Sequence, residues 1–391
     1  MHKLIISAAA ALALSVVAVP ALADDFHGFD PATHDGTMFD APSLIKMVEA
    51  AMAVRPPRNG EKYVIGFANL QRDIPFCALV EQGILQNAEA AGIEVVVADN
   101  RLDGATALAN ADSFITRNVD LVIEFQTDAE FGAVIMNRLN AADIPVIAID
   151  IPMPGAGFYG VNNPRAGFMG GSYLAQAAVA RHGMEAVMNG YFIEGELPQS
   201  GPIPAMRTGG QVAGFRAALP DFPEDQILTF DSKNTLEESF TQTNNLLSRI
   251  PEGAVIMGTA INDQAVTGIL RAAQQDGRDM ITVVGLGADE AGTLATEEDF
   301  VAAVGSFPER YGNALIPMAL ATLADVDLPD AVLINHQMVT PANLCEFNAD
   351  YECADIEVID YTFPEEAFAE HLEALRNDPA LADVQNLIPG Q

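Results

Sequence analysis

The sequence predicts an α/β protein with two Rossmann-like lobes, each built on a parallel sheet, joined by a hinge. Short apolar runs alternate with segments of helical spacing along most of the 391 residues. The runs are apolar throughout rather than at every second position, which is typical of parallel strands covered on both faces. The alternation stops after residue 150 and then restarts, which indicates two blocks of similar size.

The first block is expected to form the N-terminal lobe. Its strands are rich in β-branched and aromatic residues, and amphipathic segments connect them. The expected strands are 63–69, 93–99, 120–125 and 145–150, with helices at 76–91, 106–117 and 130–142. A bridge rich in proline and glycine, 151–164, is expected to follow as a turn region.

The second block repeats this pattern. Its expected strands are 190–195, 227–231, 254–259, 281–287, 300–306 and 331–335, with helices at 165–181, 206–218, 236–249, 263–275 and 308–324. We assign residues 61–164 and about 307–330 to the N-terminal lobe. Residues 165–306 and about 331–340 are assigned to the C-terminal lobe.

Residues 1–23 have the pattern of a secretory signal peptide. Lys3 precedes an apolar run over 4–19, and Ala21-Leu22-Ala23 supplies the small residues of a cleavage site. A transmembrane anchor is the alternative, but the run is short and no basic stop-transfer cluster follows it. We therefore expect export and a mature chain that begins at Asp24.

Two segments flank the predicted lobes. Residues 24–60 are expected to form an N-terminal extension with a helix at 42–54, and residues 341–391 a C-terminal extension with a helix near 365–376.

The composition limits the possible partners. The chain carries 54 acidic against 19 basic residues, a formal net charge of −35. Such a surface repels nucleic acid and anionic membranes, so both are excluded as partners. Because the acidic residues are dispersed, we interpret the charge as a source of solubility.

The three cysteines have different expected roles. Cys345 and Cys353 lie close together in a polar segment and are expected to form a disulfide, which export permits. Cys77 is expected to be a buried packing residue.

The residues of an enzyme are not recognisable in the sequence. The six histidines lack the spacing of a metal site, and no G-x-S-x-G motif occurs. We expect no catalytic residues, no metal and no cofactor.

Ligands of open parallel sheets bind beyond the carboxyl ends of the strands. Asp150 ends one expected strand, and its carboxylate could accept hydroxyl groups, although it could equally be a turn residue. Asn262 could cap a helix or face the cleft. Arg207 could clamp a ligand or pair with a surface acid. Phe76 could stack on a ring or lie in the core.

Several segments in a fixed order resemble the periplasmic substrate-binding proteins of sugar ABC transporters, the ribose-binding-like type I group. They include DIPFCALVEQGILQNAEAAGIEVVVADN, IPVIAID, VIMGTAINDQAVTGILRAAQQDG and ITVVGLGADEAG. The resemblance covers residues 62–335. It implies a monomeric periplasmic protein that captures a sugar or polyol between its lobes and delivers it to an ABC transporter permease. A receptor component for chemotaxis or quorum sensing is the alternative role.

The resemblance also implies a binding site. Phe76 matches an aromatic that stacks on the sugar, Asp150 a carboxylate that binds its hydroxyls, and Asn262 an asparagine at a helix start. Arg207 lies near the family's arginine. Asp73, in the same turn as Phe76, is a further candidate ligand residue.

Some polar positions of the family differ here. Ile151 stands where an arginine is expected, Gly287 where an aspartate is expected and Ser306 where a glutamine is expected. Cys77 replaces a second aromatic. Asp289 and Glu290 are candidates to substitute for the missing aspartate. These differences argue against ribose itself and leave two alternatives: a less hydroxylated ligand, or a ligand bound partly by the extensions.

Overall fold

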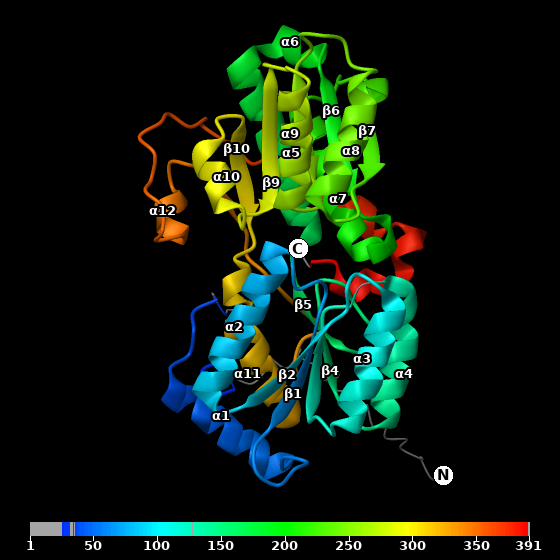
Figure 1. Ribbon diagram of the computed structural model, residues 1–391, viewed down its shortest axis with the longest axis vertical. Coiled ribbons are helices and arrows are strands. Elements are labelled where there is room, and N and C mark those ends of the chain that lie inside the picture. Colours follow the sequence, from blue (N-terminus) through cyan, green and yellow to red (C-terminus); the bar gives the residue numbers. More distant parts are fainter. Residues whose placement is uncertain (1–25, 32–33, 35, 127, 390–391) are drawn as a thin grey trace, which may run out of the picture.

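The computed structural model describes residues 26–31, 34, 36–126 and 128–389. The predicted signal peptide lies outside these ranges. The described residues form two α/β lobes stacked along the long axis of the molecule, each with helices on both faces of a six-stranded sheet (Figure 1). Within this described part, no helix is long and apolar enough to cross a membrane.

The N-terminal lobe has the strand order β11-β5-β4-β3-β1-β2, and all neighbours in it are parallel. Its strands are β1 (Val64–Asn69), β2 (Glu94–Asp99), β3 (Leu121–Glu124), β4 (Val146–Ile149), β5 (Gly157–Gly160) and β11 (Ala331–Leu333). Its helices are α1 (Ala41–Val54), α2 (Pro75–Ala91), α3 (Gly104–Thr116), α4 (Gly132–Ala141) and α11 (Tyr311–Leu323), with short 3-10 turns η1 (Ala129–Phe131) and η4 (Pro308–Arg310).

The C-terminal lobe has the order β12-β10-β9-β8-β6-β7, in which only β12 runs antiparallel to its neighbour. Its strands are β6 (Tyr191–Glu196), β7 (Ile227–Asp231), β8 (Ile256–Ala260), β9 (Ile281–Gly287), β10 (Phe300–Gly305) and β12 (Gln337–Val339). Its helices are α5 (Asn163–His182), α6 (Met184–Met188), α7 (Pro202–Ala218), α8 (Leu236–Leu247), α9 (Asp263–Gln275) and α10 (Ala291–Thr296), with 3-10 turns η2 (Pro198–Ser200) and η3 (Glu224–Gln226).

The sequence-based assignment of the last strands was wrong in one respect. Residues 331–335 were expected as a strand of the C-terminal lobe, but β11 pairs with β5 in the N-terminal sheet. The chain then crosses back, and β12 pairs with β10 in the C-terminal sheet. Neither β12 nor β5, which lies in the expected bridge, was predicted. These strands have only three or four residues each, too few for a recognisable pattern.

Three chain segments connect the lobes, and His336 joins all of them. The segments follow β5, β10 and β11. The imidazole of His336, in the third segment, accepts a hydrogen bond from the backbone N–H of Asn162 at Nε2 (3.1 Å). Its Nδ1 lies 2.9 Å from the carbonyl oxygen of Gly305, to which it donates in this tautomer. The neutral imidazole therefore links the three segments at the hinge.

Burial lowers the pKa of His336 to about 4 from the ordinary 6.5, and the charges of Arg207 and Arg165 act in the same direction. Between these two pH values the unfolded chain binds a proton that the folded chain does not. Stability is therefore expected to fall as the pH falls through this window. The expected loss between pH 7 and pH 5 is about 2 kcal/mol from this group.

Urea unfolding of wild type and His336→Gln at pH 7 and pH 5 measures this effect. The variant should lose that part of the pH dependence. Buried carboxyls such as Glu124, whose pKa burial raises to about 8, act in the opposite sense, but they cancel in the comparison. If the free energy of unfolding depended on pH equally in the two proteins, the lowered pKa of His336 would be contradicted.

The glycines of α5 let this helix lie against α7 with backbones in contact. An ideal Cβ on Gly167 would lie 1.9 Å from the carbonyl oxygen of Arg207, and one on Gly171 would lie 1.8 Å from that of Gln211. Helix α7 approaches α5 in the same way, since an ideal Cβ on Gly214 of α7 would lie 2.0 Å from the carbonyl oxygen of Phe168 in α5. Side chains at these positions are excluded, and α7 is fixed where it carries Arg207 toward the other lobe.

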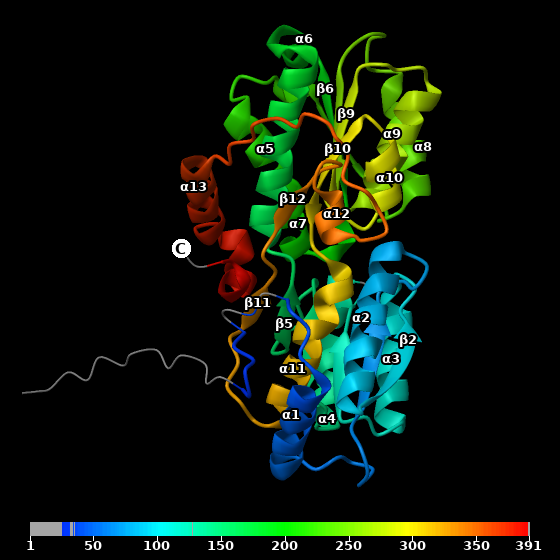
Figure 2. The same ribbon diagram turned by 90° about the vertical axis from the view of Figure 1, so that its left-hand side faces the viewer.

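The C-terminal extension contains α12 (Leu344–Phe347), α13 (Glu365–Arg376) and η5 (Pro379–Leu387). It contacts both lobes (Figures 1 and 2). The Tyr361 hydroxyl lies 2.8 Å from that of Ser172 in the C-terminal lobe, and Asn386 donates to Asp330 of the N-terminal lobe (3.2 Å). Phe368 belongs to an apolar cluster with residues from both lobes. The extension thus holds the lobes together beside the hinge.

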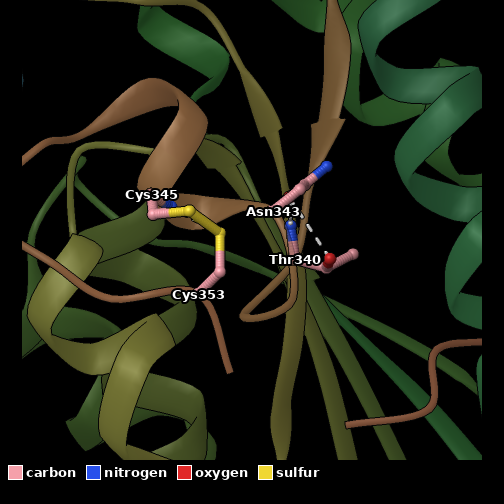
Figure 3. Close-up of a disulfide and its surroundings, with 4 residues drawn as sticks. All are labelled: Thr340, Asn343, Cys345 and Cys353. Carbon is pink, nitrogen blue, oxygen red and sulfur yellow. Dashed lines mark hydrogen bonds between the residues drawn. A yellow bond between two sulfur atoms is a disulfide. The ribbon is translucent and has the colours of Figure 1, made fainter. Parts of the chain in front are cut away.

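Cys345 and Cys353 form the expected disulfide, with Cα atoms 4.9 Å apart (Figure 3). It closes the loop after α12, next to the Thr340–Asn343 turn in which the Asn343 side chain accepts hydrogen bonds from Thr340. Cys77 is free and buried, as expected.

Thiol titration tests this arrangement. One thiol is expected in the denatured, unreduced protein and three after reduction. The native protein should react slowly, because burial raises the pKa of Cys77 and keeps the thiol protonated. Three reactive thiols before reduction would contradict the disulfide.

Candidate ligand-binding site

A cavity lies between the lobes, at the carboxyl ends of the parallel strands. Both lobes contribute equally to its wall. The N-terminal lobe supplies Leu70, Ile74, Phe76, Cys77, Phe125, Asp150 and Ile151, and the C-terminal lobe supplies Leu197, Ser200, Pro204, Arg207, Asn234, Ile261 and Asn262. Four predicted ligand residues therefore meet here: Phe76, Asp150, Arg207 and Asn262.

Asp150 follows β4 directly and has a left-handed backbone, with φ 53°. Its Oδ1 accepts a hydrogen bond from the backbone N–H of Val161 (2.8 Å), and its Oδ2 accepts one from the hydroxyl of Tyr311 (3.2 Å). Burial raises the pKa of this carboxyl, while the positive charge of Arg207 opposes the rise. Each oxygen retains a lone pair that a ligand hydroxyl could use.

Phe76 lies in the first turn of α2 and belongs to an aromatic group in the N-terminal lobe. Its ring makes edge contacts with Phe125 (6.4 Å between centroids) and Tyr311 (5.6 Å). Tyr311 also contacts the edge of Tyr159. Phe76 thus both packs against the core and lines the cavity, so the two interpretations of this residue are compatible.

Arg207 lies in α7 and is buried. Its Nε donates to Oδ1 of Asn163 (2.8 Å), and its Nη1 donates to the carbonyl oxygen of Ile261 (2.7 Å). These bonds hold the guanidinium plane and leave Nη2 for a ligand. Arg207 and Asp150 lie on opposite walls, and each shifts the pKa of the other toward the charged form, against the larger effect of burial.

Asn262 caps α9 and lines the cavity at the same time. Its Oδ1 accepts from the backbone N–H of Ala265 (2.8 Å), and its Nδ2 donates to Oδ1 of Asn234 (2.9 Å). Asn234 follows β7, so the rule of inspecting strand ends could have found it. Ser200 was also missed. Its hydroxyl is buried without a protein partner among the described residues.

Two predicted ligand residues lie outside the cavity. Asp73 is exposed, in a shallow groove with Gln71, Arg72, Asp99 and Arg101.

The second of them, Asp289, lies beside Asp263. Its backbone N–H donates to Oδ2 of Asp263 (2.9 Å), and burial together with the Asp263 charge raises the pKa of the Asp289 carboxyl. An ideal Cβ on Gly287 would lie 2.0 Å from Oδ1 of Asp289. The Asp289 carboxyl therefore occupies the space beside Gly287, but it faces another carboxyl rather than the cavity.

Residues 65–325 match the family of periplasmic binding protein domains. The chain belongs to this family. It is 24% identical to the ribose import binding protein of Escherichia coli over 242 residues, 61% of this chain and 77% of that protein. The corresponding Bacillus subtilis protein is 22% identical over 307 residues, 76% of this chain and 92% of that one.

Solved structures show the same two-lobed fold. A Bacillus halodurans ABC transporter solute-binding protein with bound myo-inositol has a TM-score of 0.60 at 22% identity, over 74% of this chain and 98% of that chain. A Mycobacterium smegmatis solute-binding protein with bound glycerol has a TM-score of 0.62 at 21% identity, over 75% of this chain and 100% of that chain. About a quarter of this chain therefore has no counterpart in these two structures.

Proposed function

We propose that this family member is an exported solute-binding protein that captures a small carbohydrate or polyol and delivers it to an ABC transporter permease. One observation carries the proposal. The cavity lies between two hinged lobes, with Asp150 on one wall and Arg207 with Asn262 on the other. A ligand that contacts both walls stabilises the closed arrangement of the lobes.

The relatives support this role. Those named above are import binding proteins for ribose, and the structural neighbours carry myo-inositol and glycerol. These names do not favour the alternative, a receptor component for chemotaxis or quorum sensing. We propose that the protein acts as a periplasmic monomer after removal of residues 1–23, and that it binds without converting its ligand.

A thermal-shift screen of the mature chain from Asp24 tests the proposal. The panel contains pentoses, hexoses, polyols, nucleosides and small acids. A ligand that binds only the folded state raises the melting temperature, and a shift for carbohydrates or polyols is expected. A flat response to all of them would contradict the proposal, as would steady consumption of a compound that binds.

A further inference from the structure

The two walls of the cavity differ in polarity. Asp150 is the single carboxyl side chain on the N-terminal wall. The remaining lining residues there are apolar, or in the case of the Cys77 thiol only weakly polar. They are Leu70, Ile74, Phe76, Cys77, Phe125 and Ile151. Two of them, Ile74 and Ile151, are each 3% exposed, and Ile151 directly follows Asp150.

The C-terminal wall carries the polar groups. Arg207 has a guanidinium nitrogen beyond its two protein bonds, and the buried Ser200 hydroxyl has no partner in the described chain. The Asn234 amide accepts from Asn262 through its oxygen, which leaves its nitrogen as a donor. Hydrogen-bonding capacity is therefore concentrated on one side of the cavity and at Asp150.

This distribution constrains the ligand. Hydroxyl groups point outward around the whole rim of an ordinary sugar ring. A hydroxyl pressed against Ile74 or Ile151 would lose its hydrogen bonds to water without replacement, which costs about 1–3 kcal/mol and corresponds to about 5- to 140-fold in affinity. A methyl or methylene group at the same place would instead gain from burial.

We infer that the ligand is a deoxygenated carbohydrate, a deoxysugar or deoxypolyol. Its hydroxylated edge contacts Asp150, Arg207, Ser200 and Asn234, and its C–H edge contacts Ile74 and Ile151. An acidic group, Asp150, and a basic group, Arg207, on opposite walls suit a ligand that is itself uncharged. The inference rests on the proposed function and narrows its ligand class.

Calorimetric titration with matched pairs tests it: L-rhamnose with L-mannose, L-fucose with L-galactose, and 2-deoxy-D-ribose with D-ribose. In the pair that fits the cavity, the deoxygenated member is expected to bind at least ~10-fold more tightly. Equal or tighter binding of the hydroxylated member in every responding pair overturns the inference but leaves the proposed function intact. If these pairs fail to bind but another carbohydrate or polyol of the thermal-shift panel binds, the inference is overturned and the proposed function stands; if none of them binds, both are overturned.

A substitution tests whether the N-terminal wall causes the preference for the deoxygenated ligand. Ile151→Thr adds a hydroxyl beside Asp150 and should reduce the discrimination within the responding pair by ~10-fold. Ile149→Thr makes the same change in buried β4, outside the cavity lining, and should lower the melting temperature while leaving the preference unchanged. Unchanged discrimination in folded Ile151→Thr overturns the role of this residue. If that variant does not fold, the wild-type comparison decides.

Discussion

Replacing Gly171 by alanine is expected to lower the free energy of unfolding by at least about 3 kcal/mol. The added Cβ would lie 1.8 Å from the carbonyl oxygen of Gln211, a backbone atom that cannot move away alone. Helices α5 and α7 would have to separate. Calorimetric melting and urea unfolding of the variant would measure the loss.

Gly209 provides the matched control for this prediction. It lies within α7, is exposed and has no heavy atom within 4 Å of an added Cβ. Alanine there should stabilise the protein by about 0.5–1 kcal/mol, because glycine is a poor helix former. If Gly171→Ala were as stable as Gly209→Ala, the close contact of the helices would be contradicted.

The second large effect concerns binding. Asp150→Ala is expected to weaken ligand binding by more than ~100-fold, about 3 kcal/mol. The change removes the carboxylate that faces the cavity. It also leaves the Val161 N–H and the Tyr311 hydroxyl without their acceptor, so the wall around the ligand loses its arrangement. Calorimetric titration with the compound found by the thermal-shift screen measures the change.

Asp73→Ala is the control for the loss of a carboxylate. Asp73 belongs to the same lobe and the same strand-to-helix turn as Phe76, but it is exposed and outside the cavity lining. Its replacement should change the affinity less than ~3-fold, since a screened surface charge contributes little. The opposite ranking of the two variants would show that the ligand binds at the rim instead of the cavity.

The fold class follows from the sequence because apolar runs and helical spacing are local properties. Inspection of the residues that follow each strand also led to Asp150 and Asn262, which line the cavity, since parallel strands bring their carboxyl ends to one edge of the sheet. The helix predicted near 365–376 is α13 (Glu365–Arg376). The disulfide could be expected because its cysteines lie eight residues apart.

The tertiary structure decided what depends on distant neighbours. β11 and β12 join different sheets although only three residues separate them, because each strand pairs with the edge that the hinge brings near. Asp289 faces Asp263 because the carboxyl of Asp263 accepts the backbone N–H groups after β9.

Arg207 reaches the cavity wall that Ser200 and Asn234 also line because α7 is held against α5 by contacts between backbones. By itself, the sequence determined the longer strands and helices and the polar residues that end them, since periodicity and turn chemistry depend on a few neighbouring residues. The partner of each edge strand, the direction of each buried carboxyl and the polarity of the whole cavity wall arise from contacts between distant residues. Only the folded structure contains those contacts.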